Sequence, residues 1–266
     1  MKISKITTQK KNNHRYNIFL QKGSTEEYAF SVDEDVLIKF HLRKGLSLTD
    51  ELIEEITSED HKQKAYNKVI RYLSYRMRTE KEIREYLQKE DLFPEHVDEI
   101  IAKLEKNNLV DDLEFAKMFV RSRINTSNKG PGLIRKELEV KGIHDENIDE
   151  ALSQFSTEEQ EEKALQLVQK RLARTSKHSF QKQLNQAKAA LMRNGYSSRL
   201  IRSVINEVRD MQDDEAEWEA IIHHGERLER RFSGKFADAE LRQKIKEGLY
   251  RQGFHLSLIH EYLQTR

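Results

Sequence analysis

The sequence predicts a mostly α-helical protein, an elongated, curved array of tandem three-helix repeats behind a small N-terminal domain rich in β-strand. Three observations predict this class. The 266 residues include only 10 Gly and 2 Pro, so the usual breakers of regular structure are scarce. Apolar residues recur with the helical period from about residue 61 onward. This helical pattern then recurs four times, which is typical of repeat architectures.

The composition limits the size of each core and the class of protein. Hydrophobic residues make up 36% of the chain and charged residues 35%, which favours small modules over one thick globule. The chain has no Cys, so disulfides and thiolate metal sites are excluded. The first residues, "MKISKITTQKKNN", lack an apolar leader, and no stretch approaches the roughly 18 apolar residues of a membrane span. We therefore expect a soluble, cytoplasmic protein without membrane contact.

Residues 1–60 have a strand pattern that the rest of the chain lacks. "RYNIFL" (15–20) and "EYAFSV" (27–32) alternate apolar and polar residues around the turn "KGST", which predicts a hairpin. "KISKIT" is a candidate for a third strand. Ser31 and Glu34 have the spacing of a capping box ahead of "DVLIKFHL", and a second short helix, "LTDELIEEI", is expected to follow. These features predict a β-hairpin and helix domain over residues 1–60.

Four segments align without a gap, starting at Ile83, Ile134, Ala187 and Ile245. Positions 0 and 4 of each segment are apolar and lie on one helix face, as do positions 14 and 18 of a further helix. Position 8 is Gly142, Gly195 or Gly253, which suits the left-handed residue that ends a helix, and Asp91 is the exception. Another helix precedes each segment, beginning near Ala65, Ala116, Ala164 and Ala220, and the first three of these helices carry Val69, Val120 and Val168 four residues later.

Each unit therefore contains three helices. We assign repeat 1 to residues 61–112, repeat 2 to 113–157, repeat 3 to 158–210 and repeat 4 to 211–266. A competing interpretation makes each unit a DNA-binding module that reads the major groove with its last helix. The last helices "PEHVDEII" and "DENIDEAL" are acidic and would be repelled by phosphates, which argues against sequence-specific reading.

The motifs that suggest chemistry have structural explanations. "NKGPGLIRKELEVKGI" (128–143) resembles a phosphate-binding loop, but no strand precedes it and it lacks the Walker A lysine pattern. Asp111 and Asp112 precede a helix, where Asp acts as a cap, and no ligand-spaced partner favours a metal. His223 and His224 are neighbours on a helix and point in different directions. We therefore expect no catalytic residue, no metal site and no cofactor.

Charge is concentrated in repeat 3. Its 53 residues contain eleven Lys and Arg against six Asp and Glu, whereas the whole chain has a formal charge of only +1. Within 177–209 the only acidic residue is Glu207. Two interpretations remain open, a solvated face and a patch that faces phosphates or an acidic partner.

Cations also recur at the end of the first helix of each repeat, where they compensate the helix dipole and would form a basic ridge along the array. From both clusters, together with Arg135 and Lys136 of the motif at 128–143, we select candidates for contact with a partner or with DNA. They are Arg76, Arg78, Arg121, Arg123, Arg135, Lys136, Lys170, Arg171, Arg174, Lys177, Lys182, Lys188, Arg193, Arg199 and Arg202.

Two segments resemble the regulatory protein RecX family, modulators of the RecA recombinase. "RMRTEKEIREYL" (76–87) is similar to the family's Arg-x-Arg-Ser-x-x-Glu-Leu segment, with Thr79 and Ile83 in its variable places. "DDLEFAKMFVRSR" and "GPGLIRKELEVKGI" (111–143) resemble its Asp-Asp, Phe-Ala and Gly-Pro-x-x-Ile-x-x-x-Leu-x-x-x-Gly-Ile pattern. The resemblance covers residues 61–208. The N-terminal domain and repeat 4 are similar to the longer forms of low-GC Gram-positive bacteria.

The resemblance implies a non-enzymatic regulator that binds the RecA filament on single-stranded DNA. Such a regulator would suppress strand exchange, ATP hydrolysis and cleavage of the SOS repressor, and so regulate recombination and DNA repair. We expect a monomer, with DNA contact through repeat 3. The alternative function is a nonspecific single-stranded DNA-binding protein that competes for the DNA lattice.

Overall fold

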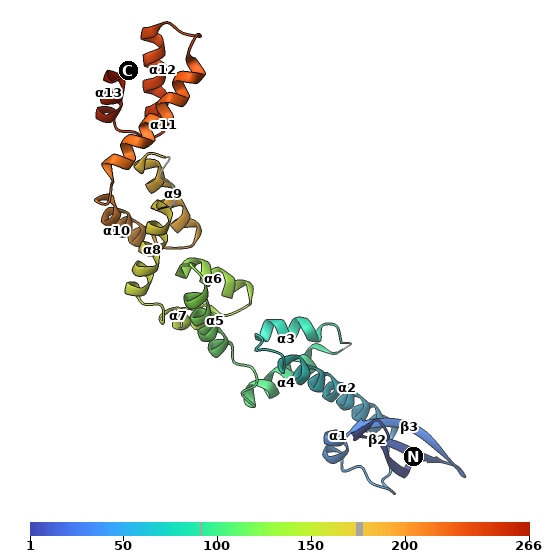
Figure 1. Cartoon of the computed structure of the whole chain (residues 1–266). Coiled ribbons are helices and arrows are strands. Elements are labelled where there is room, and N and C mark those ends of the chain that lie inside the picture. Colours follow the sequence, from blue (N-terminus) through green and yellow to red (C-terminus); the bar gives the residue numbers. More distant parts are fainter. Residues whose placement is uncertain (91, 174–177) are drawn as a thin grey trace. The chain divides into compact units, whose positions relative to one another are not determined.

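The computed structural model describes residues 1–90, 92–173 and 178–266, and Asp91, Arg174 and Lys177 lie outside these ranges. Residues 1–115 and 141–143 form one compact unit, and residues 116–140 and 144–266 form the other. The described part contains three strands and thirteen helices (Figure 1). The predicted class, a mostly helical chain of three-helix repeats with a small N-terminal sheet, is confirmed.

The N-terminal sheet contains strands β1 (Lys2–Gln9), β2 (Asn12–Lys22) and β3 (Thr25–Asp33), antiparallel in the order β1-β2-β3. Ile18 of β2 pairs with Phe30 of β3 across the predicted hairpin. Ile6 of β1, the additional strand that the sequence suggested, pairs with Ile18 from the other side. The inward-facing residues of the sheet pack with helices α1 (Glu34–Lys39) and α2 (Asp50–Leu73) around a core that includes Ile3, Val32 and Ile56. The predicted hairpin and the third strand are both present.

Two expectations about this domain are wrong. Ser31 lies within β3, and the cap of α1 is Asp33, whose side chain accepts from the Asp35 amide. The expected short helix "LTDELIEEI" continues through the expected boundary at residue 60, because α2 is a single helix of 24 residues. No Gly or Pro interrupts residues 50–73, so nothing in the sequence ends the helix there.

A buried ion pair connects the sheet to α2. Asp60, 2% exposed, accepts two hydrogen bonds from the guanidinium of Arg15 at 3.1 and 2.9 Å, and one from the Asp33 amide at 2.7 Å. Lys64 lies 2.9 Å from the same carboxylate. Burial raises the pKa of Asp60, but these donors outweigh it, so the pKa lies below its ordinary value.

Asp60→Asn is therefore expected to lower the free energy of unfolding by about 3 kcal/mol at pH 7, because Arg15 keeps a buried charge without its partner. Since the folded pKa lies below the unfolded value, the carboxylate stabilises the fold above about pH 4 and loses this effect as the pH falls further. Urea unfolding at pH 7 and in the acid range should show the gap between the two proteins shrinking. Glu55→Gln, an exposed change on the same helix, should alter stability by less than about 0.5 kcal/mol. A gap that is constant with pH would contradict this account.

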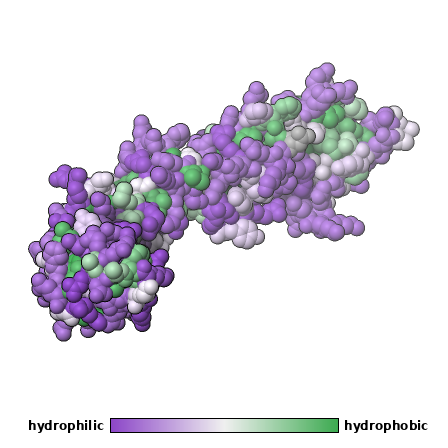
Figure 2. All heavy atoms as spheres, turned by 90° about the horizontal axis from the view of Figure 1, so that it is seen from above, coloured by the Kyte–Doolittle hydropathy of each residue, from purple (hydrophilic) through white to green (hydrophobic). Residues whose placement is uncertain are grey.

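Repeat 1 contains the end of α2 with α3 (Glu80–Leu87) and α4 (Pro94–Lys106), and repeat 2 contains α5 (Asp112–Thr126), α6 (Pro131–Val140) and α7 (Asp145–Leu152). Repeat 3 contains α8 (Thr157–Leu172), α9 (Phe180–Arg193) and α10 (Ser198–Arg209). Repeat 4 contains α11 (Asp214–Phe232), α12 (Asp238–Arg251) and α13 (Leu256–Gln264). The residues at positions 0 and 4 are buried in every repeat, and the face shown in Figure 2 is mostly hydrophilic with small apolar areas.

The three glycines at position 8 have positive φ, as predicted for residues that end a helix. They also lie at junctions where the middle helix of one repeat begins against the end of the next middle helix. In the first unit, Thr79 caps α3 and donates through Oγ1 to the carbonyl of Lys141 at 2.9 Å, beside Gly142. The Glu80 amide donates to Asp112 at 2.9 Å.

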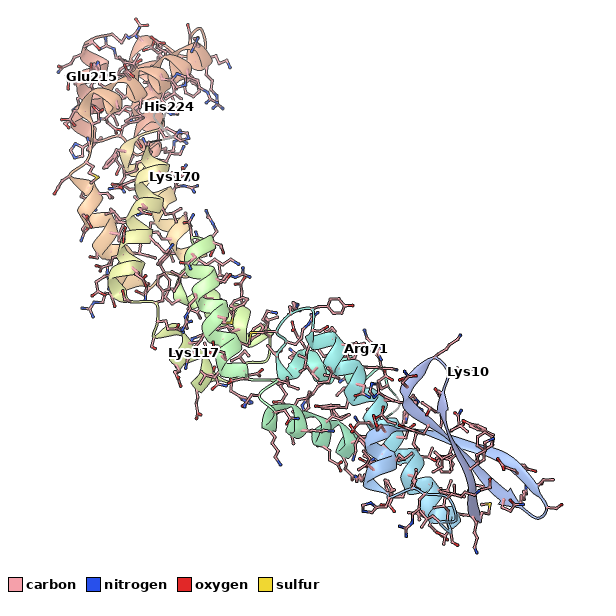
Figure 3. All side chains as sticks on the ribbon, turned by 60° about the horizontal axis from the view of Figure 1, so that its bottom comes forward. Lys10, Arg71, Lys117, Lys170, Glu215 and His224 are labelled. Atoms are coloured by element: carbon pink, nitrogen blue, oxygen red, sulfur yellow. The ribbon has the colours of Figure 1, made fainter. Side chains whose placement is uncertain are left out.

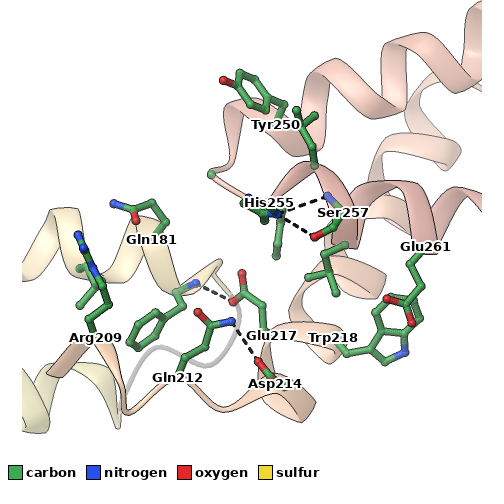
Figure 4. A pocket seen from close by; sticks show the side chains of 16 residues that line it. Gln181, Arg209, Gln212, Asp214, Glu217, Trp218, Tyr250, His255, Ser257 and Glu261 are labelled. Atoms are coloured by element: carbon green, nitrogen blue, oxygen red, sulfur yellow. Dashed lines mark hydrogen bonds between the residues drawn. The ribbon is translucent and has the colours of Figure 1, made fainter.

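In the second unit the same kind of contact occurs twice. The Gly130 amide donates to the Asn194 carbonyl at 2.6 Å, and Ser179 Oγ donates to the Gln252 carbonyl. At the second of these junctions the Phe180 amide donates to Glu217 at 2.7 Å (Figure 4). At the first, the corresponding position is Pro131, which has no amide proton and needs no acceptor.

Candidate functional site

The candidate cations of repeat 1 are engaged within the protein. Arg76 makes two hydrogen bonds to the carboxylate of Glu82, at 3.0 and 3.1 Å, and Lys141 lies 3.0 Å from the same group. Burial raises the pKa of Glu82, but these two cations outweigh it and leave the pKa below its ordinary value. Arg78 lies over the ring of Tyr72, 4.0 Å from its centre. Arg76 is therefore paired with a carboxylate, whereas Arg78 packs on an aromatic ring and keeps its charge.

The candidates of repeat 2 are mostly paired as well. Arg123 lies 2.9 Å from Glu137, which Lys129 also contacts, and Arg121 donates to Gln154 at 2.6 Å. Arg135 contacts Asp149 and lies 3.6 Å from Asp145. Lys136 is exposed, and no ion pair involves it within the described ranges. One cation of the four selected in this repeat thus remains available.

Most candidate cations of repeat 3 form no ion pair within the described part of the chain. Lys182 donates to the side-chain carbonyl of Gln252 at 2.6 Å, and Arg171 is exposed at the end of α8. Five further candidates are exposed and form no ion pair with any residue that the structure describes: Lys170, Lys188, Arg193, Arg199 and Arg202. Lys170 can be seen on α8 in Figure 3. Arg174 and Lys177 lie outside the described residues.

One helix of repeat 3 carries its cations on a single face. Arg199, Arg202 and Arg209 are spaced by three and seven residues along α10, so they lie within one exposed stripe while Leu200, Ile201 and Val204 face the core. Arg209 was not among the candidates that the sequence selected, although the same spacing includes it. We call Arg193, Arg199, Arg202 and Arg209 the repeat 3 patch.

Two aromatic residues of repeat 3, Tyr196 and Phe180, are not available for base stacking. Tyr196 is buried, and burial raises its pKa to about 12. Phe180 is partly buried and packs against the core of repeat 3. Single-stranded DNA-binding surfaces combine cations with exposed aromatic rings. Within repeat 3 these two rings supply no such surface, whereas the exposed Tyr250 of repeat 4 lines the same groove as Arg209.

A groove of about 1060 Å³ lies between repeats 3 and 4, both in the second unit (Figure 4). Several of its polar groups serve local structure, and Arg209 of the repeat 3 patch also lines it. Gln212 donates to Asp214 at 3.2 Å, and His255 caps the start of α13 while its Nδ1 lies 2.8 Å from Ser257 Oγ. These hydrogen bonds hold the connection between α10 and α11 and the start of α13.

The sequence analysis also considered whether Asp111 with Asp112, or His223 with His224, could bind a metal. Asp111 caps α5 by accepting from the Glu114 amide at 2.9 Å, which confirms the predicted capping, and Asp112 accepts from the Glu80 amide instead. In residues 1–90, 92–173 and 178–266, no group of three His, Asp or Glu side chains could hold a metal ion. Nor does a helix in these ranges combine the length and apolar character needed to cross a membrane.

These features define a helical-repeat protein whose third repeat presents exposed cations. Comparison with known proteins identifies the family. Residues 1–49 match the regulatory protein RecX N-terminal domain, 65–104 the first RecX three-helix domain and 111–152 the second. The third RecX three-helix domain matches twice, at 158–205 and 215–263, which agrees with two copies of one repeat.

Full-length relatives and a crystal structure agree with this match. Regulatory protein RecX of Oceanobacillus iheyensis is 46% identical over 98% of this chain and 97% of its own length. That of Bacillus subtilis is 40% identical over 98% and 97%. A crystal structure of regulatory protein RecX superposes with a TM-score of 0.70 at 40% identity, covering 77% of this chain and 98% of that one. The chain therefore belongs to the RecX family of regulatory proteins.

Proposed function

We propose that the chain binds the RecA recombinase assembled on single-stranded DNA and limits the activity of that filament. The observation that carries this proposal is the likeness to regulatory RecX proteins over nearly the whole chain. Binding would suppress strand exchange, ATP hydrolysis and cleavage of the SOS repressor, and the chain would act as a monomer without a cofactor. The four repeats, in the ranges assigned from the sequence, would each contribute surface to the contact.

The distribution of paired charge supports a role for repeat 3 in this contact. Three of the six candidate cations of repeats 1 and 2 pair with carboxylates of the same chain, whereas the cations of the repeat 3 patch face solvent and form no ion pair among the described residues. A filament that contains DNA is an anionic target, and unpaired exposed cations favour association with it. We propose that the repeat 3 patch faces the DNA phosphates or acidic side chains of the filament.

The second candidate function is nonspecific binding to single-stranded DNA. The same patch favours it, but Tyr196 is buried and Phe180 packs against the core, so neither of these repeat 3 rings offers an exposed stacking surface. Filament binding is therefore the preferred function, and bare DNA should bind weakly.

The two candidate functions predict different affinities of the protein for bare single-stranded DNA. Fluorescence anisotropy with labelled single-stranded DNA, alone and as a preassembled RecA filament, should show filament binding at least about tenfold tighter at moderate salt. Raising the salt should weaken bare-DNA binding steeply and filament binding less, because protein contacts are less sensitive to screening. Equal or stronger binding to bare DNA would contradict the preferred function.

A further inference from the structure

A second concentration of positive charge lies in a small pocket of the second unit, which none of the repeat 3 patch residues lines. The pocket has a volume of about 430 Å³ and lies where α9 begins beside α11 and the end of α12. The residues that line it and matter here are His178, Lys182, His224, Arg227, Arg231 and Gln252. Five of these six side chains carry or can acquire a positive charge, and none of the described lining residues is acidic.

At two other places in the chain where two cations approach each other, a carboxylate binds both of them. Glu82 receives Arg76 and Lys141, and Glu137 receives Arg123 and Lys129. In the pocket, Lys182 donates to the uncharged carbonyl of the Gln252 side chain. Like charges that line one pocket repel one another, so an anion from outside would stabilise the arrangement.

A histidine in this pocket replaces a core residue of the other repeats. His224 lies on α11 (Figure 3) at the position that Val69, Val120 and Val168 occupy in repeats 1 to 3. All three valines are buried, and His224 is only 8% exposed. A polar ring costs stability where a valine fits, and departures of this kind are expected at functional sites.

The second histidine of the pocket has an unused hydrogen-bonding atom. The ring of His178 lies 5.8 Å from that of His224, and its Nδ1 is buried without a hydrogen-bond partner among the described residues. Burial lowers the pKa of His178, and the charge of Lys182 lowers it further. An anion in the pocket would oppose both effects and favour the protonated ring, which donates from both nitrogens.

We infer that this pocket binds a phosphate group. Arg227 and Arg231 supply planar donors that match phosphate oxygens, Lys182 supplies a point charge, and His178 and His224 donate when protonated. A free phosphate and a phosphodiester of a nucleic acid offer the same oxygens. The inference concerns the isolated chain, so it stands or falls apart from the proposed action on RecA.

The direct test is a sulfate titration of the full-length chain, followed by NMR of the histidine rings at constant ionic strength. Sulfate keeps its charge between about pH 6 and 8, so any pH effect belongs to the protein. Saturable shifts of His178 and His224 are expected, with His61, an exposed histidine of the first unit that does not line the pocket, as an internal reference. Affinity should rise as the pH falls, by at most about tenfold per unit for each proton taken up. Uniform shifts without saturation would overturn the inference.

Variants inside and outside the pocket distinguish anion binding in the pocket from attraction to the overall positive charge of the chain. Arg227→Gln with Arg231→Gln should weaken sulfate binding at least about tenfold, whereas Arg230→Gln, on the same helix but outside the pocket, should not. His224→Val introduces the residue of the other repeats, so it should keep the helical circular dichroism and still weaken binding. An equal loss in the Arg230 variant would overturn the inference.

A short oligo(dT) distinguishes the two sources of phosphate. If a nucleic-acid backbone is the ligand, the oligonucleotide should shift His178 and compete with sulfate. If free phosphate is the ligand, inorganic phosphate should shift the same rings and the oligonucleotide should not. Failure of sulfate, inorganic phosphate and oligonucleotide alike would overturn the inference, and RecA inhibition would remain a separate measurement.

Discussion

Reversing the charge of three of the four arginines in the repeat 3 patch, with Arg193→Glu, Arg199→Glu and Arg202→Glu, is expected to weaken RecA filament inhibition by about 10- to 100-fold. The three side chains are exposed and form no ion pair within the described ranges, so the change removes charge from the contact and not from the fold. The measurement is the concentration of protein that halves DNA-dependent ATP hydrolysis by RecA. The far-ultraviolet circular dichroism should stay unchanged.

The control has the same change of charge in another place. Lys235→Glu, Arg242→Glu and Arg251→Glu alter three exposed cations of repeat 4. If inhibition depends on the location of the charge, this variant should inhibit nearly as well as the natural sequence. Equal inhibition by both variants and the natural sequence would show that the patch is only a solvated face.

Gly195→Ala is expected to lower the free energy of unfolding by about 3 to 5 kcal/mol. Gly195 has φ of 83°, and a Cβ there would lie 2.2 Å from the backbone nitrogen of Leu133 and 3.0 Å from the carbonyl carbon of Gly132. Backbone atoms cannot rotate away, so repeats 2 and 3 would have to separate. Urea unfolding followed by circular dichroism measures the loss.

Substitutions at two other glycines provide the comparison for Gly195→Ala. Gly234 has φ of 76° with nothing within 4 Å of an added Cβ, so Gly234→Ala should cost only about 1 kcal/mol of backbone strain. At Gly142 the neighbour is the flexible side chain of Lys81, so an intermediate loss is expected. Equal losses at the three positions would contradict the importance of the junction contact.

The repeat pattern was accessible to sequence reasoning because it depends on local rules. Apolar positions four residues apart and a glycine that ends each helix identify α6, α9 and α12 without knowledge of their neighbours. The exact partners of the helix starts were not accessible. Thr79 and Lys141 are 62 positions apart, and nothing local indicates that a hydroxyl from one repeat satisfies a carbonyl of the next.

The errors near the N-terminus have local causes. Ser and Asp are both residue types that cap helices. Because the paired strand β3 continues through Ser31 to Asp33, Asp33 is the cap. The run from Asp50 to Leu73 has turn-like polar residues in its middle but no breaker, so one helix forms. The pairing of β3 with β2 thus decided the cap, and the absence of a breaker decided the length of the helix.

The candidate site was only partly predictable for an electrostatic reason. Sequence counts identify where cations outnumber carboxylates, which selects repeat 3 as the basic repeat. They do not show that Glu82 and Glu137 each neutralise two cations from different segments. The pocket around His178 was missed for the same reason, although the replacement of a repeated valine by His224 was a visible signal.

The measurement that tests the central claim most directly is the length of RecA filaments on single-stranded DNA after addition of sub-stoichiometric protein. Labelled chain and filament length can be followed on the same molecules by fluorescence microscopy. The account predicts that the chain co-localises with filaments and that the filaments become shorter or stop growing. Filaments that keep growing at the same rate, with the label on bare DNA only, would contradict it.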